Sequence, residues 1–304
     1  MKMLVTGGCG FIGSHMVDRL IDDGHDVIVI DNLSADCHDE FYFNDKARYV
    51  SDDIAEYWDI EEHFIGVDTV FHFAAEARIQ PCINQPTLAI RTNTLGTSNV
   101  LTAARDHGVR RVLYSSSSSI YGSTNPLEFS DTSALRESMP NGCLNPYSVS
   151  KMAGEELCRI YYEVYGLQTI TFRYFNVYGP REPVRGDYAP VVGKFLRQRN
   201  AGEPMTVVGD GLQRRDFTHV DDIIEANYLA SKVDDELAYG EMFNIGAGKN
   251  YSILDLVGMI GGDHIHTEER PGEARETLSC TDKARLVLGW KPTVNFAEYI
   301  RDQI

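Results

Sequence analysis

The stretch Met3-Leu-Val-Thr-Gly-Gly-Cys-Gly-Phe-Ile-Gly13 joins a short apolar run to a glycine-rich turn, and an amphipathic segment from Ile12 to Asp22 follows it. The apolar run predicts a buried strand, and the helical spacing of apolar residues after the turn predicts a helix. Glycines let a backbone turn tightly and approach a ligand, while the N-terminus of a helix offers free N–H groups to an anion. The stretch therefore predicts a strand, a phosphate-binding turn and a helix.

An acidic residue stands 18 residues past Gly13, at the end of the next apolar run, Val27-Ile-Val-Ile30. A carboxylate there can accept hydrogen bonds from both hydroxyls of an adenosine ribose, and it repels a 2′-phosphate. No Arg or Lys lies between Asp31 and Lys46. We therefore predict that the cofactor is NAD rather than NADP, with a simple turn-capping role for Asp31 as the alternative.

The alternation of apolar runs and helix-like segments continues along the chain. Further strands are predicted at 67–73, 111–115 and 168–174, and a long helix at 148–165. Such an alternation predicts an α/β fold, a doubly wound parallel sheet of the Rossmann type. We expect an NAD-binding domain over 1–175 with returning segments near 216–247, interleaved with a smaller mixed α/β substrate-binding lobe over 176–304.

Composition narrows the class of protein. The 304 residues are 43% hydrophobic and 24% charged, with a formal net charge of −17. That charge argues against nucleic acid or an anionic membrane as the main partner. The six cysteines are scattered without a Cys-x-x-Cys pair, so neither a metal site nor a disulfide framework is predicted. The first strand starts at once and no apolar stretch could span a bilayer, so we expect no signal peptide and a cytoplasmic protein.

A second group of residues indicates hydride-transfer chemistry. The serine run Ser115–Ser119 follows a predicted strand, and Tyr147 and Lys151 lie four residues apart on a predicted helix. A neighbouring ammonium lowers the pKa of a phenol toward a useful value, and a serine hydroxyl at the strand end can bond the reacting oxygen. We predict Ser117, Tyr147 and Lys151 as the catalytic residues. A second Tyr-x-x-x-Lys, Tyr42 to Lys46, has no such serine run before it and is interpreted as a surface match.

Together these motifs resemble the extended short-chain dehydrogenase/reductase superfamily, and more narrowly its nucleotide-sugar epimerase/dehydratase branch. The segments that carry the resemblance are Thr6–Gly13, Asp31, His72–Ala75, Ser115–Gly122, Tyr147 with Lys151, Arg173–Pro180, Gly209–Phe217 and Arg270–Glu273. The resemblance covers nearly the whole chain.

The resemblance implies a role for each matching position. Tyr147 would be the base, Lys151 its partner and a ribose ligand, and Ser117 the hydroxyl partner. NAD would be held by Gly7, Gly10, Phe11, Ile12, Gly13, Asp31, Asn32, Asp53, Ile54, Phe73, Ala74, Ala75, Asn93, Tyr147, Lys151 and Tyr174. A nucleotide-sugar, most simply a UDP-sugar, would be held by Ser117, Ser118, Asn176, Val207, Arg215, Arg270 and Thr277. It also implies a homodimer formed through helix 148–165, although core packing of the same residues remains open.

The branch includes several reactions, which differ in the residues that follow the catalytic serine. Dehydratases carry Asp-Glu there, decarboxylases a Glu, and 3,5-epimerases a Cys, whereas this chain has Ser118 and Ser119. A serine hydroxyl has no useful pKa for removing a proton from carbon. We therefore predict 4-epimerisation of UDP-glucose/galactose or UDP-GlcNAc/GalNAc through a transient 4-keto sugar. A small residue, Thr277, at the position that borders the hexose would admit the N-acetyl group.

Other functions stay open at this point. A UDP-glucuronate 4-epimerase is one alternative, because similar serine runs occur in such enzymes. Another nucleotide-sugar dehydratase or reductase, or a net sugar dehydrogenase, is a second. A non-enzymatic NAD-binding regulatory protein is a third, against which the intact Ser117, Tyr147 and Lys151 argue.

Overall fold

The computed structural model describes residues 1–35, 40–122, 134–183 and 189–304. A seven-stranded, wholly parallel sheet organises the first part of the chain, with strand order β3-β2-β1-β4-β5-β6-β11. The strands are β1 (Lys2–Thr6), β2 (Asp26–Ile30), β3 (Arg48–Val50), β4 (Thr69–His72), β5 (Arg111–Ser117), β6 (Gln168–Tyr174) and β11 (Glu241–Ile245). Starting from β1, the chain first adds β2 and β3 on one side and then returns to add β4, β5 and β6 on the other. In a parallel sheet a ligand crevice is expected at this switch point, beyond the carboxyl ends of β1 and β4.

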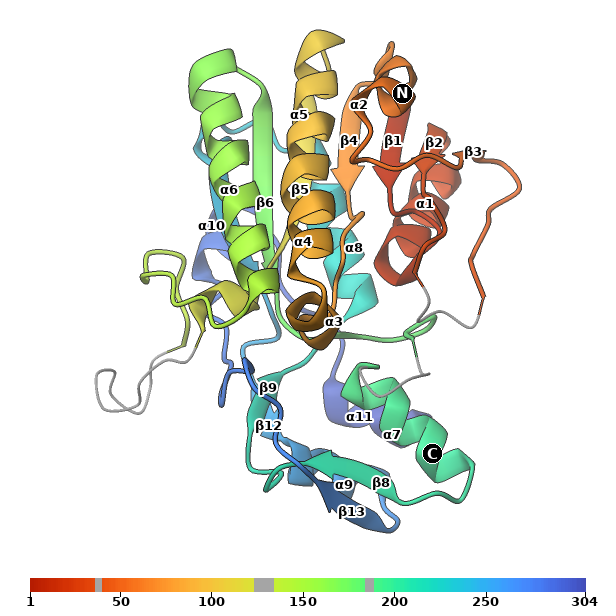
Figure 1. Ribbon diagram of the computed structural model, residues 1–304, viewed down its shortest axis with the longest axis vertical. Helices are drawn as coiled ribbons and strands as arrows, with labels where there is room; N and C mark the ends of the chain where they lie inside the picture. The colour runs from red at the N-terminus through yellow and green to blue at the C-terminus, as the bar shows by residue number, and fades with distance from the viewer. Residues whose placement is uncertain (36–39, 123–133, 184–188) are drawn as a thin grey trace.

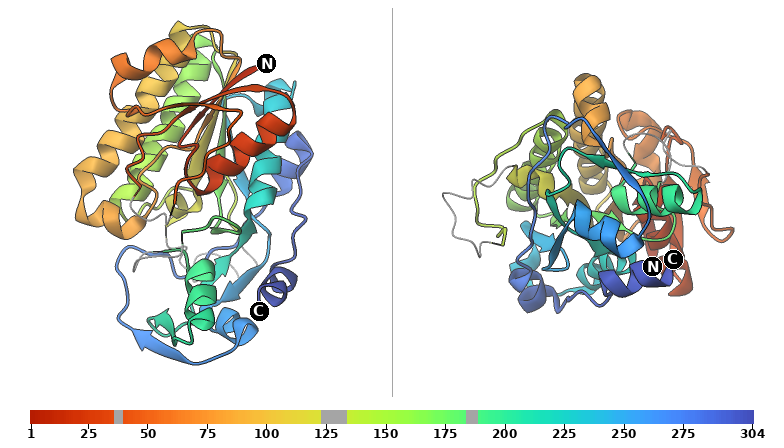
Figure 2. Two further views of the ribbon diagram at one scale, coloured as in Figure 1. Left: turned by 90° about the vertical axis from the view of Figure 1, so that its right-hand side faces the viewer. Right: turned by 90° about the horizontal axis from the view of Figure 1, so that it is seen from below.

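Helices cover both faces of this sheet, which Figure 2 shows nearly edge-on in its left view. On one face lie α1 (Phe11–Asp22), α8 (Val220–Lys232) and α10 (Asp282–Leu288). On the other lie α5 (Thr97–Asp106) and α6 (Pro146–Tyr165). Strand residues such as Val5, Phe71 and Leu113 are fully buried, as expected where both faces are covered. The predicted doubly wound α/β fold is confirmed.

Short helical segments connect these elements. They are α2 (Tyr57–Ile60), η1 (Glu61–Phe64), α3 (Ile79–Asn84), α4 (Pro86–Ile90), the π-helical η2 (Arg91–Gly96), η3 (Ser118–Tyr121) and η4 (Glu236–Ala238). The segments α3 and η3 matter most for function, because they border the carboxyl ends of β4 and β5.

A smaller lobe lies below the large sheet in Figure 1. It contains α7 (Val191–Asn200), α9 (Ile253–Ile260) and α11 (Phe296–Asp302), together with three two-stranded sheets. Those sheets pair β7 (Val177–Tyr178) with β10 (Thr218–His219), β8 (Met205–Val208) with β13 (His264–Thr267), and β9 (Arg214–Asp216) with β12 (Asn250–Ser252). The lobe has its own apolar core, while α8 and β11 return to the large sheet. The functional division at residue 176 stays a prediction.

The described residues contain neither a disulfide bond nor a helix that could span a membrane. All five cysteines there carry free thiols, and Cys37 lies outside the described residues. Among the helices of the described ranges, none has the length and apolar character needed to cross a bilayer.

Candidate active site

The glycine-rich turn is packed so tightly that Gly7 and Gly13 leave no room for a side chain. Gly7 has φ +70°, and a Cβ there would lie 2.7 Å from the backbone nitrogen of Ala74. A Cβ on Gly13 would overlap the carbonyl oxygen of Gly7. Gly10 then begins α1 without a side-chain hydrogen bond to the free N–H groups of the first turn. The turn therefore leaves the positive end of α1 available for a pyrophosphate, with Phe11 and Ile12 lining the adjoining cleft.

Asp31 and Asn32 follow β2 at the same edge of the sheet. One carboxylate oxygen of Asp31 accepts from the Cys9 backbone N–H and the other from that of Leu33, both at 2.9 Å. Each oxygen keeps acceptor capacity, so the carboxylate can also receive two ribose hydroxyls. The residues of this edge thus fit NAD, whose nicotinamide would supply the hydride acceptor at the far end of the crevice.

The predicted adenine-side residues lie past β3. Asp53 pairs with Arg91 at 2.8 Å, and Ile54 is buried against Gly96. Asn93 is also buried, but its amide already bonds the backbone of Glu76 and the Ser150 hydroxyl. Asn93 therefore fixes the loop after β4, which begins with Phe73, Ala74 and Ala75.

The catalytic candidates converge where β5 and α6 meet. Tyr147 and Lys151 lie one turn apart on α6, whose N-terminus is capped by Asn145, and both side chains are buried. The Lys151 ammonium donates to the Ser115 carbonyl at 2.8 Å. Burial raises the pKa of the Tyr147 phenol to about 12, although its hydrogen bond with Ser117 lowers it in part. Burial likewise lowers the pKa of Lys151 to about 8.

The serine run divides into distinct structural positions. Ser115 donates to the Tyr174 hydroxyl at 3.2 Å, and Ser116 donates to a carboxylate oxygen of Glu155 at 2.6 Å. Ser117 ends β5 and accepts from the Ser119 backbone N–H at 3.2 Å, which caps η3. Ser118 and Ser119 then lie on η3 and line the cleft.

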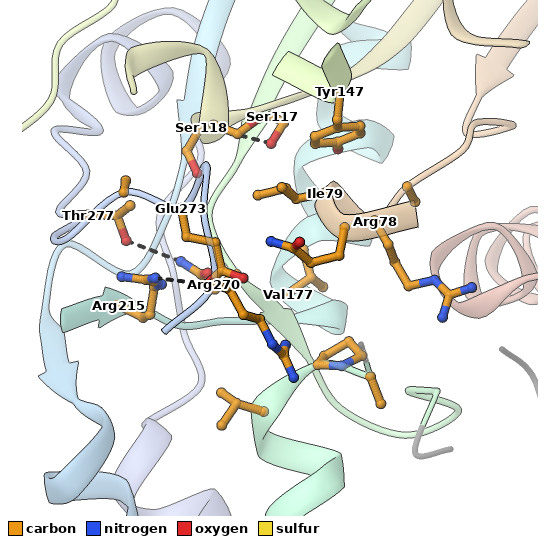
Figure 3. A pocket seen from close by; sticks show the side chains of 18 of the residues that line it. Arg78, Ile79, Ser117, Ser118, Tyr147, Val177, Arg215, Arg270, Glu273 and Thr277 are labelled. Atoms are coloured by element: carbon orange, nitrogen blue, oxygen red, sulfur yellow. Dashed lines mark hydrogen bonds and ion pairs between the residues drawn. The ribbon is translucent and has the colours of Figure 1, made fainter. Parts of the chain in front are cut away.

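The cleft between the sheet and the lobe has a volume of about 440 Å³. Figure 3 shows Tyr147 and Ser117 at one end of it, and Arg215 and Arg270 toward the other. Arg215 is largely buried, and its nearest carboxylate oxygen, on Glu273, is 3.6 Å away. Burial lowers the pKa of Arg215, and one terminal nitrogen donates to the Arg214 and Arg275 carbonyls at 3.0 and 3.3 Å. These contacts position the guanidinium without a close carboxylate, so it is suited to bind an anion.

Two more predicted substrate residues meet between these ends. The Asn176 amide donates to the Thr277 hydroxyl at 3.2 Å, and Asn176 also donates to the Asp216 carbonyl at 3.0 Å. Asn176 has φ +27°, a conformation that costs energy in a non-glycine residue. The two side chains form one polar wall of the cleft, so Thr277 is held in place and does not project freely.

Val207, predicted as a substrate-binding residue, is not among the side chains that line the cleft, and its binding role stays a prediction. Its side chain is fully buried in the core of the lobe, whereas Thr206 and Val208 face the cleft. Successive residues of a strand point to opposite faces, so a shift of one residue along β8 moves the side chain from cleft to core.

Several cleft residues were not predicted. Glu182 is buried, and one of its carboxylate oxygens has no partner among the described residues. Gln80 and Asn145 donate to the Pro271 and Gly272 carbonyls, each at 2.8 Å. These contacts join positions more than a hundred residues apart, which sequence spacing does not reveal. Glu182 does follow the Arg173–Pro180 motif, the one local signal that could have marked it.

A glycine-rich turn at a helix N-terminus, a buried Tyr147–Lys151 pair and a serine at a strand end are the features that a dinucleotide-dependent enzyme requires. The family model for NAD dependent epimerase/dehydratase enzymes matches residues 3–246. The chain belongs to this family, which acts on nucleotide-sugars, and its cofactor is NAD.

Similar proteins agree with this assignment. A putative UDP-glucose 4-epimerase of Methanocaldococcus jannaschii is 35% identical over 98% of this chain and 96% of its own length. The solved UDP-glucose 4-epimerase of Thermotoga maritima, with UDP-glucose, matches with a TM-score of 0.91 and 32% identity, covering 99% of this chain and 96% of that one. The UDP-N-acetylglucosamine 4-epimerase of Methanobrevibacter ruminantium, in complex with UDP-N-acetylmuramic acid, matches with a TM-score of 0.89, at the same identity and coverages.

Proposed function

We propose that this protein is a 4-epimerase of UDP-sugars that works through a transient 4-keto intermediate. One observation carries the choice among the reactions of the family: the two residues after the catalytic serine candidate, Ser118 and Ser119, line the sugar end of the cleft and bear only hydroxyls. Neither can remove a proton from carbon at neutral pH. Hydride removal and return at C4 needs no such group.

The residues at the end of β5 have a defined part in this reaction. The Ser117 hydroxyl bonds the phenol of Tyr147 and also O4 of the sugar. It thereby orients the O4 hydroxyl of the sugar toward Tyr147, the base. Tyr147 takes the proton from O4. NAD, held by the glycine-rich turn and Asp31, would supply the hydride acceptor for C4. Lys151 lies one turn further along α6, and its positive charge would favour the phenolate. The sugar presents its opposite face before the hydride returns, and Tyr147 gives the proton back.

The nucleotide end of the cleft supports a diphosphate. Arg215 and Arg270 approach the same space from β9 and from the loop before Thr277. Two guanidinium groups can hold diphosphate oxygens in a bidentate manner and fix the pivot about which the sugar turns. Thr277 is smaller than an aromatic residue, so we include N-acetylated hexoses in the proposed range.

A second candidate, UDP-glucuronate as substrate, is favoured by a single side chain. The Ser119 hydroxyl is buried in the cleft wall and has no partner among the residues the structure describes. Turned toward the cleft, this hydroxyl would donate to a carboxylate on C5 of the sugar. Epimerisation at C4 would follow the same steps with this substrate.

A panel of substrates tests the proposal. Purified protein is incubated with UDP-glucose, UDP-galactose, their N-acetyl counterparts, UDP-glucuronate, and dTDP- and GDP-hexoses, and inversion at C4 is read by proton NMR. We expect inversion of at least one UDP-hexose without accumulation of NADH. Failure with every UDP-hexose but turnover of UDP-glucuronate would select the second candidate, and net NADH formation would contradict epimerisation.

Removal of the proposed base tests the mechanism, and a second tyrosine on the same helix provides the matched control. Tyr147→Phe keeps the ring but removes the phenol, so the rate should fall by about 10²–10⁴-fold, the usual contribution of a general base. Tyr165→Phe, on the exposed part of the same helix, should keep full activity. Equal activity of Tyr147→Phe and the unaltered protein would contradict the proposed role of Tyr147.

A further inference from the structure

A buried ion pair lies directly behind the serine run. The carboxylate of Glu155 receives two N–H groups of Arg173, at 2.9 and 2.7 Å, and the two side chains are only 2% and 1% exposed. The same carboxylate accepts the Ser116 hydroxyl at 2.6 Å. None of these three residues is in the proposed catalytic or binding set.

Two residues on successive turns of α6, Lys151 and Glu155, form hydrogen bonds with the serine run. Tyr147, Lys151 and Glu155 are spaced by four residues, so they follow one another along one side of the helix. Lys151 bonds the backbone of Ser115, and Glu155 bonds the side chain of Ser116. The helix that carries the base is thus fastened to the strand immediately before Ser117.

Arg173 fastens the other side of Ser117. It is paired with Ser116 across β5 and β6, and its guanidinium carbon lies 4.5 Å from the centre of the Tyr121 ring. Tyr121 ends η3 and donates its hydroxyl to Asn244 at 2.7 Å. Ser117 therefore lies between two anchored points, Ser116 before it and Tyr121 after it.

A buried ion pair contributes little net stability, because desolvation of the two charges offsets their attraction. The Glu155–Arg173 pair is therefore better explained by the positions that it imposes on Ser116 and Tyr121. We propose that Glu155 and Arg173 are positioning residues, which act through Ser116 and Tyr121 to hold the Ser117 hydroxyl in register with the Tyr147 phenol. This inference depends on the proposed function only for its kinetic test.

Ser116→Ala is the informative variant, since it removes one anchoring hydroxyl without leaving a buried charge. We expect kcat to fall about tenfold while KM for the UDP-sugar stays within about twofold, because small displacements of a catalytic group are costly to the reacting geometry alone. Ser231→Ala is the matched control: Ser231 is also buried and bonds a backbone carbonyl, but it lies on α8 away from the cleft.

A second measurement needs no turnover. The Ser117 hydrogen bond lowers the pKa of the Tyr147 phenol. Displacement of Ser117 should therefore raise that pKa. Tyrosinate absorbance is titrated in the NAD-loaded protein, and the Tyr147→Phe background is subtracted. We expect an upward shift in Ser116→Ala and none in Ser231→Ala.

Glu155→Gln extends the test to the charge, with the exposed neighbour Glu156→Gln as its control. If Glu155→Gln folds, kcat and the phenol titration should change in the same direction as in Ser116→Ala; if it does not fold, Ser116→Ala decides. A wild-type kcat and an unshifted phenol pKa in Ser116→Ala would overturn the inference. If the unaltered protein inverts no UDP-sugar, the proposed function fails, and the phenol titration alone decides on the positioning role.

Discussion

At the scale of single residues, burial sets the acid–base behaviour of the cleft. Burial raises the pKa of the Tyr147 phenol to about 12, which favours its neutral form, and lowers the pKa of Lys151 to about 8, which leaves the ammonium mainly charged at neutral pH. A positive charge brought close to the phenol shifts it toward the phenolate. The same burial acts on Glu182, whose pKa is raised to about 8, although backbone N–H groups of Gly193 and Gly179 lower it in part.

Glu182 makes the stability of the protein depend on pH. Because its folded pKa is about 8 against an ordinary value of 4.5, the folded protein binds more protons between these pH values than the unfolded chain. Stability should therefore fall as pH rises from about 4.5 to 8. Glu182→Gln should raise the unfolding midpoint at pH 8 by several degrees and flatten this dependence, as measured by thermal unfolding at a series of pH values.

The exposed Glu268→Gln is the control for this experiment and should leave the profile unchanged. The opposite result, a Glu182→Gln protein that is less stable than the original at pH 8 and equally sensitive to pH, would show that the carboxylate has a compensating partner.

At the scale of elements, two amides fasten the loop that carries Arg270 to the large sheet's side of the cleft. Gln80 of α3 donates to the Pro271 carbonyl, and Asn145, which caps α6, donates to the Gly272 carbonyl. The N-terminal cap of α6, two residues before Tyr147, therefore also helps to hold the loop that carries Arg270. Helix α6 thus positions both the Tyr147 side chain at one end of the cleft and, through its cap Asn145, the Arg270 loop at the other.

Gln80→Ala should weaken substrate binding more than it slows the chemistry. One hydrogen bond contributes about 1 kcal/mol, so we expect KM for the UDP-sugar to rise about fivefold while kcat changes by less than about twofold. Gln85→Ala, at the exposed end of the same short helix, should match the original protein. A fall in kcat at constant KM would contradict the binding role; steady-state kinetics distinguishes the two results.

At the scale of the whole molecule, one helix face remains uncovered. On α6, Leu157 and Tyr161 pack against the core, whereas Ile160 and Val164 are 37% and 62% exposed. The nearby η2 adds Leu95, which is 49% exposed. The predicted dimer helix thus has both an inner and an outer apolar side, and we propose that the outer side forms a homodimer.

A charge on that face tests the dimer. Light scattering should give about twice the chain mass of 34.1 kDa for the original protein and the single-chain mass for Val164→Arg. Leu286→Arg, at an 81% exposed leucine on α10, should remain a dimer. A monomeric original protein at micromolar concentration would contradict the proposal.

Much of the fold was predictable because its signals are local. Apolar runs of strand length, a glycine turn before a helix and Asp31 after the next strand each depend on neighbours within a few residues. Helix α5 was missed, since its buried side comprises mainly Val100, Leu101 and two alanines, a weak apolar period. Strand β3 has only three residues, and pairing with β2 rather than its own composition makes it a strand.

The sequence by itself determined the parallel sheet and the glycine-rich turn before α1, and it marked Ser117, Tyr147 and Lys151 as the catalytic candidates, because backbone geometry and helical spacing act over short distances. Only the tertiary structure decided which serines serve packing and which face the cleft, that Val207 points into the core, and that Glu155 pairs with Arg173. These outcomes depend on strand register and on contacts between elements distant in the chain. Burial then set the protonation of the groups that meet there, and burial exists only once the chain has folded.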